Sequence, residues 1–216
     1  MNTLHLIPSQ IEWQRFFGSR KLESAAPALP LQTAADKYGV WGLCGIGPAA
    51  AALSTSLLIR TLKPNRIVLL GIAGAMPASG LRPGDLVQAS SECFADLGFE
   101  DDQGFHTFDE MDMPILSWAG EPFGCTYDAE TNFEHLPSLP FITVSSVTNS
   151  EARANKLYDS FNAAVENMEG AGVAMAAQLH GVAFSEVRAI SNIVGPRDPK
   201  NWRINEAIEA LRDLYD

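Results

Sequence analysis

Short runs of β-branched and apolar residues alternate along this chain with longer runs that have helical spacing. The candidate strands are 3–7, 39–43, 66–71, 85–90, 141–147 and 183–190, and the candidate helices are 48–62, 150–160, 170–180 and 205–215. Strands that alternate with helices form a sheet with helices packed on its faces. The nearly continuous apolar run at 67–70 is typical of a strand buried on both sides. The pattern therefore predicts an α/β fold.

Length and composition limit the classes of protein that this chain can belong to. Its 216 residues suit one domain, 46% are hydrophobic and only 19% are charged, which excludes a disordered chain. The first ten residues do not resemble a signal peptide, and no apolar run is long enough to span a membrane. The three cysteines, Cys44, Cys93 and Cys125, are scattered like reduced thiols. We expect a cytoplasmic protein.

The charge is unevenly distributed. The net charge is −11, and no Lys or Arg lies between Arg82 and Arg153, a stretch that contains 14 acidic residues. This acidity argues against nucleic acid and anionic membranes as partners. The segment at about 94–140 is acidic, rich in Gly, Pro and aromatic residues, and weakly periodic. We expect loops and short strands inserted into the core, which form a solubilising face or an oligomer rim.

The motifs typical of metal sites are absent from the sequence. There is no CxxC or HExxH motif, and the four histidines lie far apart. We expect neither a metal nor a cofactor.

Two glycine-rich turns follow candidate strands. The turn GIGPAAAA at 45–52 fits the dinucleotide fingerprint with Ala50 in its third place, but the next strand ends at Gly71 without the acidic residue that the fingerprint requires. A tight packing turn and the wall of a small-ligand pocket remain open. The second turn, LLGIAGAM at 69–76, would place Ile72, Ala73 and Gly74 at the same sheet edge, so a ligand can approach the backbone there.

Two further segments carry polar residues at expected junctions. In VENMEGAGVAMAA at 165–177, Glu169 stands where a strand meets a helix, and the simpler alternative is a helix-terminal charge. In VRAISNIVGPRD at 187–198, Asn192 ends a buried strand, and the simpler alternative is a turn-forming amide.

Five segments in this order resemble the nucleoside phosphorylase/nucleosidase superfamily: GIGPAAAA, LLGIAGAM, PGDLV, ENMEGAGVA and VRAISN. The chain is similar, within that superfamily, to purine nucleosidases that hydrolyse N-ribosidic bonds. The resemblance implies a single domain over 1–216 with a mixed central β-sheet flanked by helices. It also implies a homo-oligomer, a purine nucleoside as substrate, and no cofactor.

The resemblance also implies site residues. Glu169 would accept hydrogen bonds from the ribose hydroxyls, Met168 would pack on the sugar, and Glu12 would deprotonate the attacking water. Asn192 would contact the base, with Val147 and Thr148 lining the base pocket.

Two departures refine the expected activity. No Lys or Arg stands in either glycine turn, which favours water over phosphate as the nucleophile. Nucleosidases that act on adenine compounds carry Asp at the position of Asn192, and an amide cannot act as a general acid. An amide suits a 6-oxopurine, whose anion leaves more easily. An adenine-specific nucleosidase and an inactive purine-binding module remain alternatives.

A cation is expected to bind the remote end of an anionic substrate. Arg197 is the first candidate because it follows the strand that ends at Asn192. The other candidates are Arg15, Lys200 and Arg203.

Overall fold

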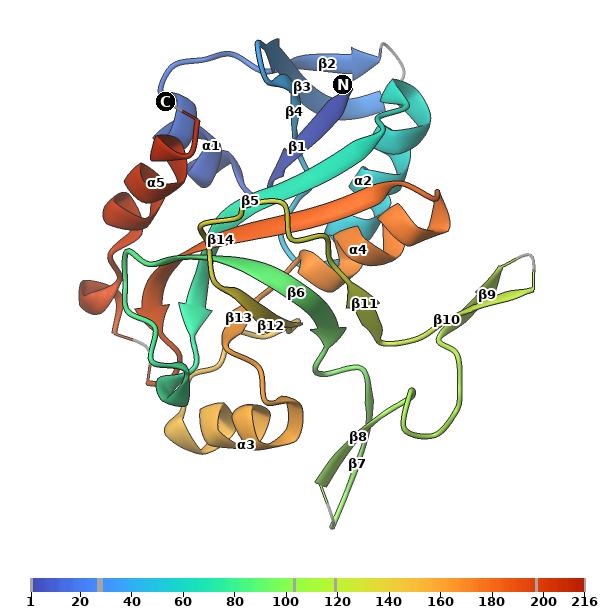
Figure 1. The fold of residues 1–216 in the computed structure, drawn as a ribbon, viewed down its shortest axis with the longest axis vertical. Coiled ribbons are helices and arrows are strands. Elements are labelled where there is room, and N and C mark those ends of the chain that lie inside the picture. Colours follow the sequence, from blue (N-terminus) through green and yellow to red (C-terminus); the bar gives the residue numbers. More distant parts are fainter. Residues whose placement is uncertain (1, 27–28, 103, 119, 197, 216) are drawn as a thin grey trace.

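A ten-stranded mixed sheet forms the centre of the protein (Figure 1). The computed structural model describes residues 2–26, 29–102, 104–118, 120–196 and 198–215. The strand order is β11-β6-β12-β13-β5-β1-β4-β3-β2, and β14 pairs with both β5 and β6. The strands of this sheet are β1 (Thr3–Ile7), β2 (Glu23–Ala26), β3 (Leu29–Asp36), β4 (Gly39–Leu43), β5 (Arg66–Ala75), β6 (Leu86–Phe94), β11 (Thr126–Asp128), β12 (Ser138–Thr143), β13 (Val165–Asn167) and β14 (Ala183–Ile193).

Helices cover both faces of the sheet. They are α1 (Gln10–Phe17), α2 (Pro48–Leu62), α3 (Glu151–Phe161), α4 (Gly170–Leu179) and α5 (Ile204–Asp213). Helices α2 and α4 pack against each other on one face, and α1 and α5 pack on the other. In Figure 1, α1 and α5 lie on the left, and α3 lies below the ends of the central strands. No helix within the described ranges is both long enough and apolar enough to cross a membrane.

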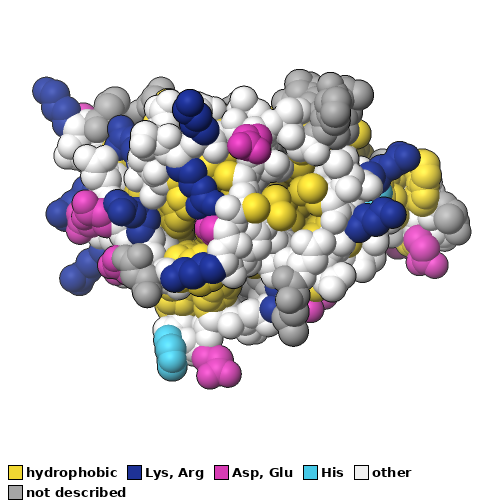
Figure 2. All heavy atoms as spheres, turned by 90° about the horizontal axis from the view of Figure 1, so that it is seen from above, with side chains coloured by type: hydrophobic (Ala, Val, Ile, Leu, Met, Phe, Trp, Pro, Cys, Tyr) yellow, Lys and Arg dark blue, Asp and Glu magenta, His cyan; other side chains and the backbone are white. Residues whose placement is uncertain are grey.

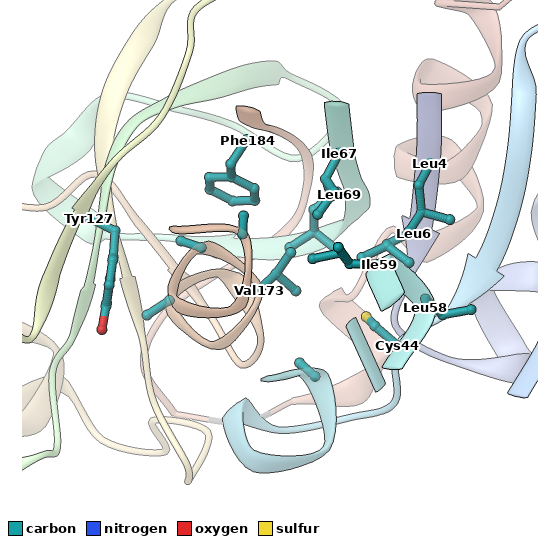
Figure 3. Packing of buried hydrophobic residues seen from close by; sticks show 14 of the residues in the cluster. Leu4, Leu6, Cys44, Leu58, Ile59, Ile67, Leu69, Tyr127, Val173 and Phe184 are labelled. Atoms are coloured by element: carbon teal, nitrogen blue, oxygen red, sulfur yellow. The ribbon is translucent and has the colours of Figure 1, made fainter. Parts of the chain in front are cut away.

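The alternation of side chains along β5 explains the two layers. Ile67 and Leu69 point toward α2 and α4, where Val173 and Leu58 join the same core (Figure 3). The intervening residues, including Leu70, point toward α1 and α5. Ile67, Leu69 and Leu70 are each 0% exposed, so the central strand is buried on both faces, as its apolar sequence predicts.

The acidic segment forms small structures at the side of the sheet. Strands β7 (Gly98–Asp101) and β8 (Gly104–Thr107) form one hairpin, and β9 (Leu116–Trp118) pairs with β10 (Glu121–Phe123). Strand β11 joins the main sheet, where it pairs with β6. Figure 2 shows the molecule from above the view of Figure 1. On this face, Lys and Arg side chains (dark blue) lie around exposed hydrophobic side chains (yellow).

The α/β fold with a mixed central sheet agrees with the sequence prediction. Strands β1 and β4 and helix α2 have the predicted bounds. The central strands are longer than predicted: β5 continues to Ala75 and β14 to Ile193, because the two strands go on pairing with each other up to Ala75 and Ile193. Helix α1 and strand β13 were not among the predicted elements.

Candidate active site

A cavity of about 230 Å³ opens at the carboxyl ends of β5 and β14. In parallel sheets, ligands bind outside this edge. Most of the residues proposed from the sequence line this one cavity: Glu12, Ile72, Ala73, Gly74, Val147, Met168, Glu169 and Asn192. The other lining residues are Pro8, Ile46, Glu166, Asn167, Ser191 and Trp202.

Helix α1 brings Glu12 to the cavity. Ser9 is its N-cap, and its Oγ accepts from the Glu12 backbone N–H at 3.2 Å while donating to Glu12 Oε2 at 2.6 Å. The other carboxylate oxygen accepts the Ile72 backbone N–H at 3.0 Å. Burial raises the pKa of Glu12, and the hydrogen bonds from Ser9 and Ile72 partly oppose that rise. A carboxylate with a raised pKa suits a general base.

Glu169 lies between β13 and α4, at the N-cap of the helix. It does not cap the helix through its side chain; instead its Oε1 accepts the backbone N–H of Gly47 at 3.3 Å. Gly47 has φ +89°, so the first glycine-rich turn directs a backbone donor at this carboxylate. The turn therefore forms part of the pocket wall, because its neighbour Ile46 lines the cavity.

Arg188 is a buried cation behind the cavity that sequence reasoning missed. It is 0% exposed, and its Nη2 lies 3.3 Å from Glu169 Oε2. Its Nε donates to Glu186 at 2.7 Å, and its Nη1 donates to the Ile72 carbonyl at 3.3 Å. A buried charge is tolerated when it is paired and hydrogen-bonded in this way. Arg188 thus fixes Glu169 from behind and lowers the pKa of Glu12 by its charge.

Glu92 and Glu186 form a second buried layer. Both are 0% exposed, and Glu186 Oε2 has no hydrogen-bond donor when every carboxyl in the described part of the chain is ionised. Burial, followed by the charge of Glu186, raises the pKa of Glu92 well above its usual range. A protonated Glu92 supplies the missing donor to Glu186. The pair is then hydrogen-bonded and carries one negative charge instead of two.

Gly71 keeps Arg188 and Glu12 close together. A Cβ at this position would lie 2.4 Å from Arg188 Nη1 and 3.1 Å from Glu12 Oε1. The first contact is shorter than any real Cβ contact, so a side chain at position 71 would push the guanidinium out of place. The second glycine-rich turn is therefore required for packing behind the cavity.

Asn192 is the next-to-last residue of β14, and its side chain is half-buried. Its Oδ1 accepts from Ser191 Oγ at 2.7 Å, and its Nδ2 donates to the Ile193 carbonyl at 3.1 Å. The second N–H of the amide is available to a ligand, since Nδ2 carries two hydrogens. The amide therefore faces the cavity with a donor in a fixed orientation.

The structure places the remaining candidates differently. Thr148 is buried and does not line the cavity; its backbone N–H and its hydroxyl both donate to Glu166. Arg197 lies outside the described residues. Of the other cations proposed from the sequence, Arg15 donates to Asn205 and Arg203 pairs with Glu206. These two and Lys200 are exposed and do not line the cavity.

The chemistry of the cavity follows from its polar groups. Three carboxylates, from Glu12, Glu166 and Glu169, and two amides, from Asn167 and Asn192, line a space whose other described walls are mainly apolar, and no Lys or Arg is among its described lining residues. Carboxylates accept hydrogen bonds from hydroxyls and stabilise nearby positive charge. No group of three or more His, Cys, Asp or Glu in the described ranges is arranged to hold a metal ion.

Comparison with known proteins identifies the family of the chain. A family model described as "Phosphorylase superfamily" matches residues 34–214. A futalosine hydrolase of Streptomyces coelicolor is 35% identical over 92% of this chain and 86% of the relative. A 5'-methylthioadenosine/S-adenosylhomocysteine nucleosidase of Staphylococcus aureus is 29% identical over 73% and 70%. The native structure of futalosine hydrolase from Helicobacter pylori superposes with a TM-score of 0.77 at 16% identity, covering 99% of this chain and 95% of that one. The chain belongs to the phosphorylase superfamily.

Proposed function

We propose that this protein hydrolyses the N-ribosidic bond of futalosine, releasing hypoxanthine and dehypoxanthine futalosine. The observation that carries the proposal is that Glu12, Glu169 and Asn192 share one cavity, with Arg188 paired to Glu169 behind it. The similarity to the Streptomyces coelicolor relative named futalosine hydrolase supports it. So do the strings ECFADLG at 92–98 and ISNIVGPRDPKNW at 190–202, which resemble that subgroup.

Glu12 acts as the general base. Its carboxylate takes a proton from a water molecule, and the water oxygen forms a bond to C1' of the ribose. The Ile72 and Ser9 donors hold the carboxylate in one orientation, and its raised pKa strengthens it as a base. The absence of Lys and Arg among the described lining residues supports water, and not phosphate, as the nucleophile.

Glu169 and Asn192 act on the two sides of the bond that breaks. Glu169 accepts hydrogen bonds from the ribose hydroxyls and stabilises the positive charge that develops on the sugar. The base leaves as an anion with the electron pair of the C1'–N9 bond, and Asn192 donates a hydrogen bond to its N7/O6 edge. The proton that Glu12 took from water then passes through solvent to this anion, which gives hypoxanthine and restores the Glu12 carboxylate. Met168 packs against the sugar.

The wider context of the reaction follows from the substrate. Futalosine hydrolysis belongs to menaquinone biosynthesis by the futalosine route, which takes place in the cytoplasm. The aromatic carboxylate of futalosine requires a cation or several donors, and the candidates remain Arg197, Arg15, Lys200 and Arg203.

A homo-oligomer is also part of the proposal. Leu53 on α2 and Met113 are large apolar side chains that are 64% and 53% exposed. Met113 lines an apolar groove of about 430 Å³, together with Pro48, Ala49 and Ala52 from the start of α2. A second copy of the chain would bury this surface, and the 94–140 segment would form part of the contact.

Hydrolysis of methylthioadenosine, adenosylhomocysteine or aminofutalosine is the second candidate. The similarity to the Staphylococcus aureus nucleosidase favours it. The amide of Asn192 opposes it, because adenine is a poor leaving group that benefits from a proton donor at N7.

Base release from two substrates tests the proposal. The purified protein is incubated with futalosine and, separately, with methylthioadenosine, with and without inorganic phosphate. We expect hypoxanthine from futalosine at a rate that phosphate does not change. Rapid adenine release without hypoxanthine would support the second candidate instead, and a requirement for phosphate would exclude hydrolysis.

A further inference from the structure

Arg188 is shared between two carboxylates, and its shorter hydrogen bond goes to the one outside the cavity. Its Nε donates to Glu186 at 2.7 Å, whereas its Nη2 lies 3.3 Å from Oε2 of Glu169. The other oxygen of Glu169 accepts the backbone N–H of Gly47, also at 3.3 Å. A carboxylate has about four lone-pair sites. Both hydrogen bonds to Glu169 are long, so its acceptor sites on the cavity side remain free.

An arginine that paired with Glu169 alone would cancel most of the charge of this carboxylate. In the proposed reaction Glu169 stabilises positive charge on the sugar, and a cation at 3.3 Å opposes that stabilisation. Glu186 is on the same strand as Arg188, is 0% exposed and does not line the cavity. Its carboxylate can therefore balance the guanidinium without touching the substrate.

Glu186 is itself one of two carboxyls that face each other. A Cβ on Gly170 would collide with Oε1 of Glu92 and with Oε2 of Glu186, so these two oxygens point at the same small space at the start of α4. Two ionised carboxylates that share a buried space repel each other strongly. The Glu92–Glu186 pair therefore holds one proton and one negative charge.

The start of helix α4 favours that single charge. Asn167 Oδ1 accepts the backbone N–H of Gly170 at 2.8 Å, and Thr143 Oγ1 accepts the next one, also at 2.8 Å. The same two side chains donate hydrogen bonds to Glu92. The positive end of the helix dipole lies beside the pair and stabilises a negative charge there. Because neutral side chains cap the helix, the side chain of Glu169 is free to face the cavity.

We propose that Glu92 and Glu186 together hold one negative charge that balances Arg188, so that the charge of Glu169 stays available to the cationic sugar. Both are positioning residues, because neither lines the cavity. This inference rests on the proposed function, since it concerns the positive charge that forms when the N-ribosidic bond breaks. With the pair and Arg188 neutral as a group, the carboxylates at the cavity determine its potential.

Two ligands that differ by one charge test the inference without turnover. In 9-deazainosine a carbon–carbon bond joins base and ribose, so the bond cannot be hydrolysed. Its iminoribitol analogue has a nitrogen in place of the ring oxygen, and this nitrogen carries a proton at pH 6. Isothermal titration calorimetry at pH 6 measures the Kd of each ligand. The ratio of the two Kd values reports the charge of the site, because a displaced side chain weakens both ligands alike.

Three variants change the charge of the pair in steps. Glu92→Gln leaves a carboxylate beside Arg188 and should keep the wild-type ratio. Glu186→Gln leaves a carboxylate only at position 92, farther from Nε, and the double variant Glu92→Gln/Glu186→Gln leaves none. We expect the double variant to lose about tenfold of the preference for the cationic ligand, the order expected for one unit charge at an effective dielectric constant of about 20. Glu186→Gln should lie between the wild type and the double variant.

Glu130→Gln is the matched control. Glu130 is exposed and also pairs with an arginine, Arg66, which begins β5 at the end away from the cavity. This variant should leave the ratio unchanged. Equal ratios in the wild type and the double variant would overturn the inference, as would a ratio in Glu92→Gln as low as that of the double variant. If the double variant does not fold, equal ratios in Glu92→Gln and Glu186→Gln would overturn it.

The pH profile of turnover gives a second readout that a loss of packing would not shift. Burial raises the pKa of Glu12, and the charge of Arg188 is among the causes that lower it. An unbalanced Arg188 lowers this pKa further, so the acid limb of kcat/KM for futalosine should move to lower pH in the double variant and not in Glu92→Gln. An acid limb at the same pH in both would contradict the inference. The other titratable groups around the guanidinium within the described ranges are Glu169, Glu186, Glu92 and the thiol of Cys44, whose pKa is raised by burial.

The two proposals can fail separately. If the wild type does not hydrolyse futalosine but its preference for the cationic ligand falls in the double variant, the proposed function is wrong and the charge balance stands. If it releases hypoxanthine from futalosine and the variants change neither the ratio nor the acid limb, the charge balance is wrong and the proposed function stands. If it hydrolyses futalosine but binds neither ligand, the acid limb decides. A wild type that neither binds nor hydrolyses would overturn both.

Discussion

The Nη2 atom of Arg188 lies 3.3 Å from Oε2 of Glu169, and the two side chains are 1% and 6% exposed. The cation sits on the protein side of the carboxylate, so the cavity side remains free to accept hydroxyls. The pair therefore fixes the orientation of Glu169. Removing Arg188 would leave Glu169 and Glu186 in a buried place without the cation that pairs with both, which is strongly unfavourable.

Replacing Glu169 tests its contact with the ribose. We expect Glu169→Ala to lower kcat for hypoxanthine release from futalosine by about 100- to 10,000-fold, because the stabilisation of the sugar cation is lost. Glu169→Gln should recover little of this loss, since a neutral amide lacks the charge. Turnover is followed by the hypoxanthine formed under substrate saturation. An unchanged kcat in Glu169→Ala would remove this residue from the mechanism.

The pH dependence of the rate tests Glu12. Burial raises its pKa, and the ionised form is the base, so kcat/KM should rise with pH through a midpoint above the usual 4.5 of a glutamic acid and then level off. Glu12→Gln should lose this acid limb and about 100- to 10,000-fold in rate. Initial rates between pH 4 and pH 9 measure both effects. An identical acid limb in the variant would assign the titration to another group.

Replacing Asn192 by Asp tests the choice of leaving group. An Asp at this position can be protonated and donate to N7, which assists the departure of adenine. We expect Asn192→Asp to raise the ratio of adenine release from methylthioadenosine to hypoxanthine release from futalosine by about tenfold or more. Asn65→Asp, at an exposed residue before β5, is the matched control and should leave the ratio unchanged. A fall in the ratio would contradict the role given to the amide.

The proton on Glu92 should make stability depend on pH. Because its pKa is raised in the folded state, the wild type gains stability at low pH and loses it as the pH rises above about 4.5, by up to about 1.4 kcal/mol per pH unit. Glu92→Gln keeps a donor to Glu186 without a titrating proton. Urea unfolding between pH 5 and pH 8 should show the variant gaining on the wild type as the pH rises. Parallel curves would show that Glu92 does not titrate in this range.

A single charge on α2 tests the proposed oligomer. Leu53→Glu places a carboxylate at an exposed apolar position of α2, where burial in a contact between copies would be costly. We expect light scattering after size-exclusion chromatography to show a homo-oligomer for the wild type and a lower mass for the variant. A monomeric wild type would contradict this part of the proposal.

Long periodic elements could be predicted from the sequence, and short ones could not. Helix α2 has 15 residues and the predicted bounds, and Pro48 stands at its start. Strand β13 has only three residues, too few for a period to be recognised, although it places Glu166 and Glu169. Helix α1 has eight residues, and its Ser9-x-x-Glu12 spacing is a start signal that could have indicated it.

The site residues show the same division. Residues that follow recognisable motifs, such as Glu169, lie at the cavity, because a motif at a strand end fixes where a side chain goes. The ion pairs of Arg188 could not be predicted from the sequence. Glu169 belongs to another element, and Glu186 is only two residues away on the same strand, a spacing that does not by itself indicate an ion pair. A charged residue in an apolar strand is also usually expected to be exposed. The sequence could not show that Thr148 lies behind the cavity wall while Glu166 lines it, because the hydrogen bond that joins them links residues 18 positions apart.

The formal charge of −11 counts every carboxyl as ionised. With Glu92 protonated against Glu186, the native molecule is less negative than its composition states, and the unfolded chain releases that proton at neutral pH. Folding is therefore coupled to proton uptake from the solvent. The enthalpy of unfolding that a calorimeter records for this protein will contain the ionisation heat of the buffer.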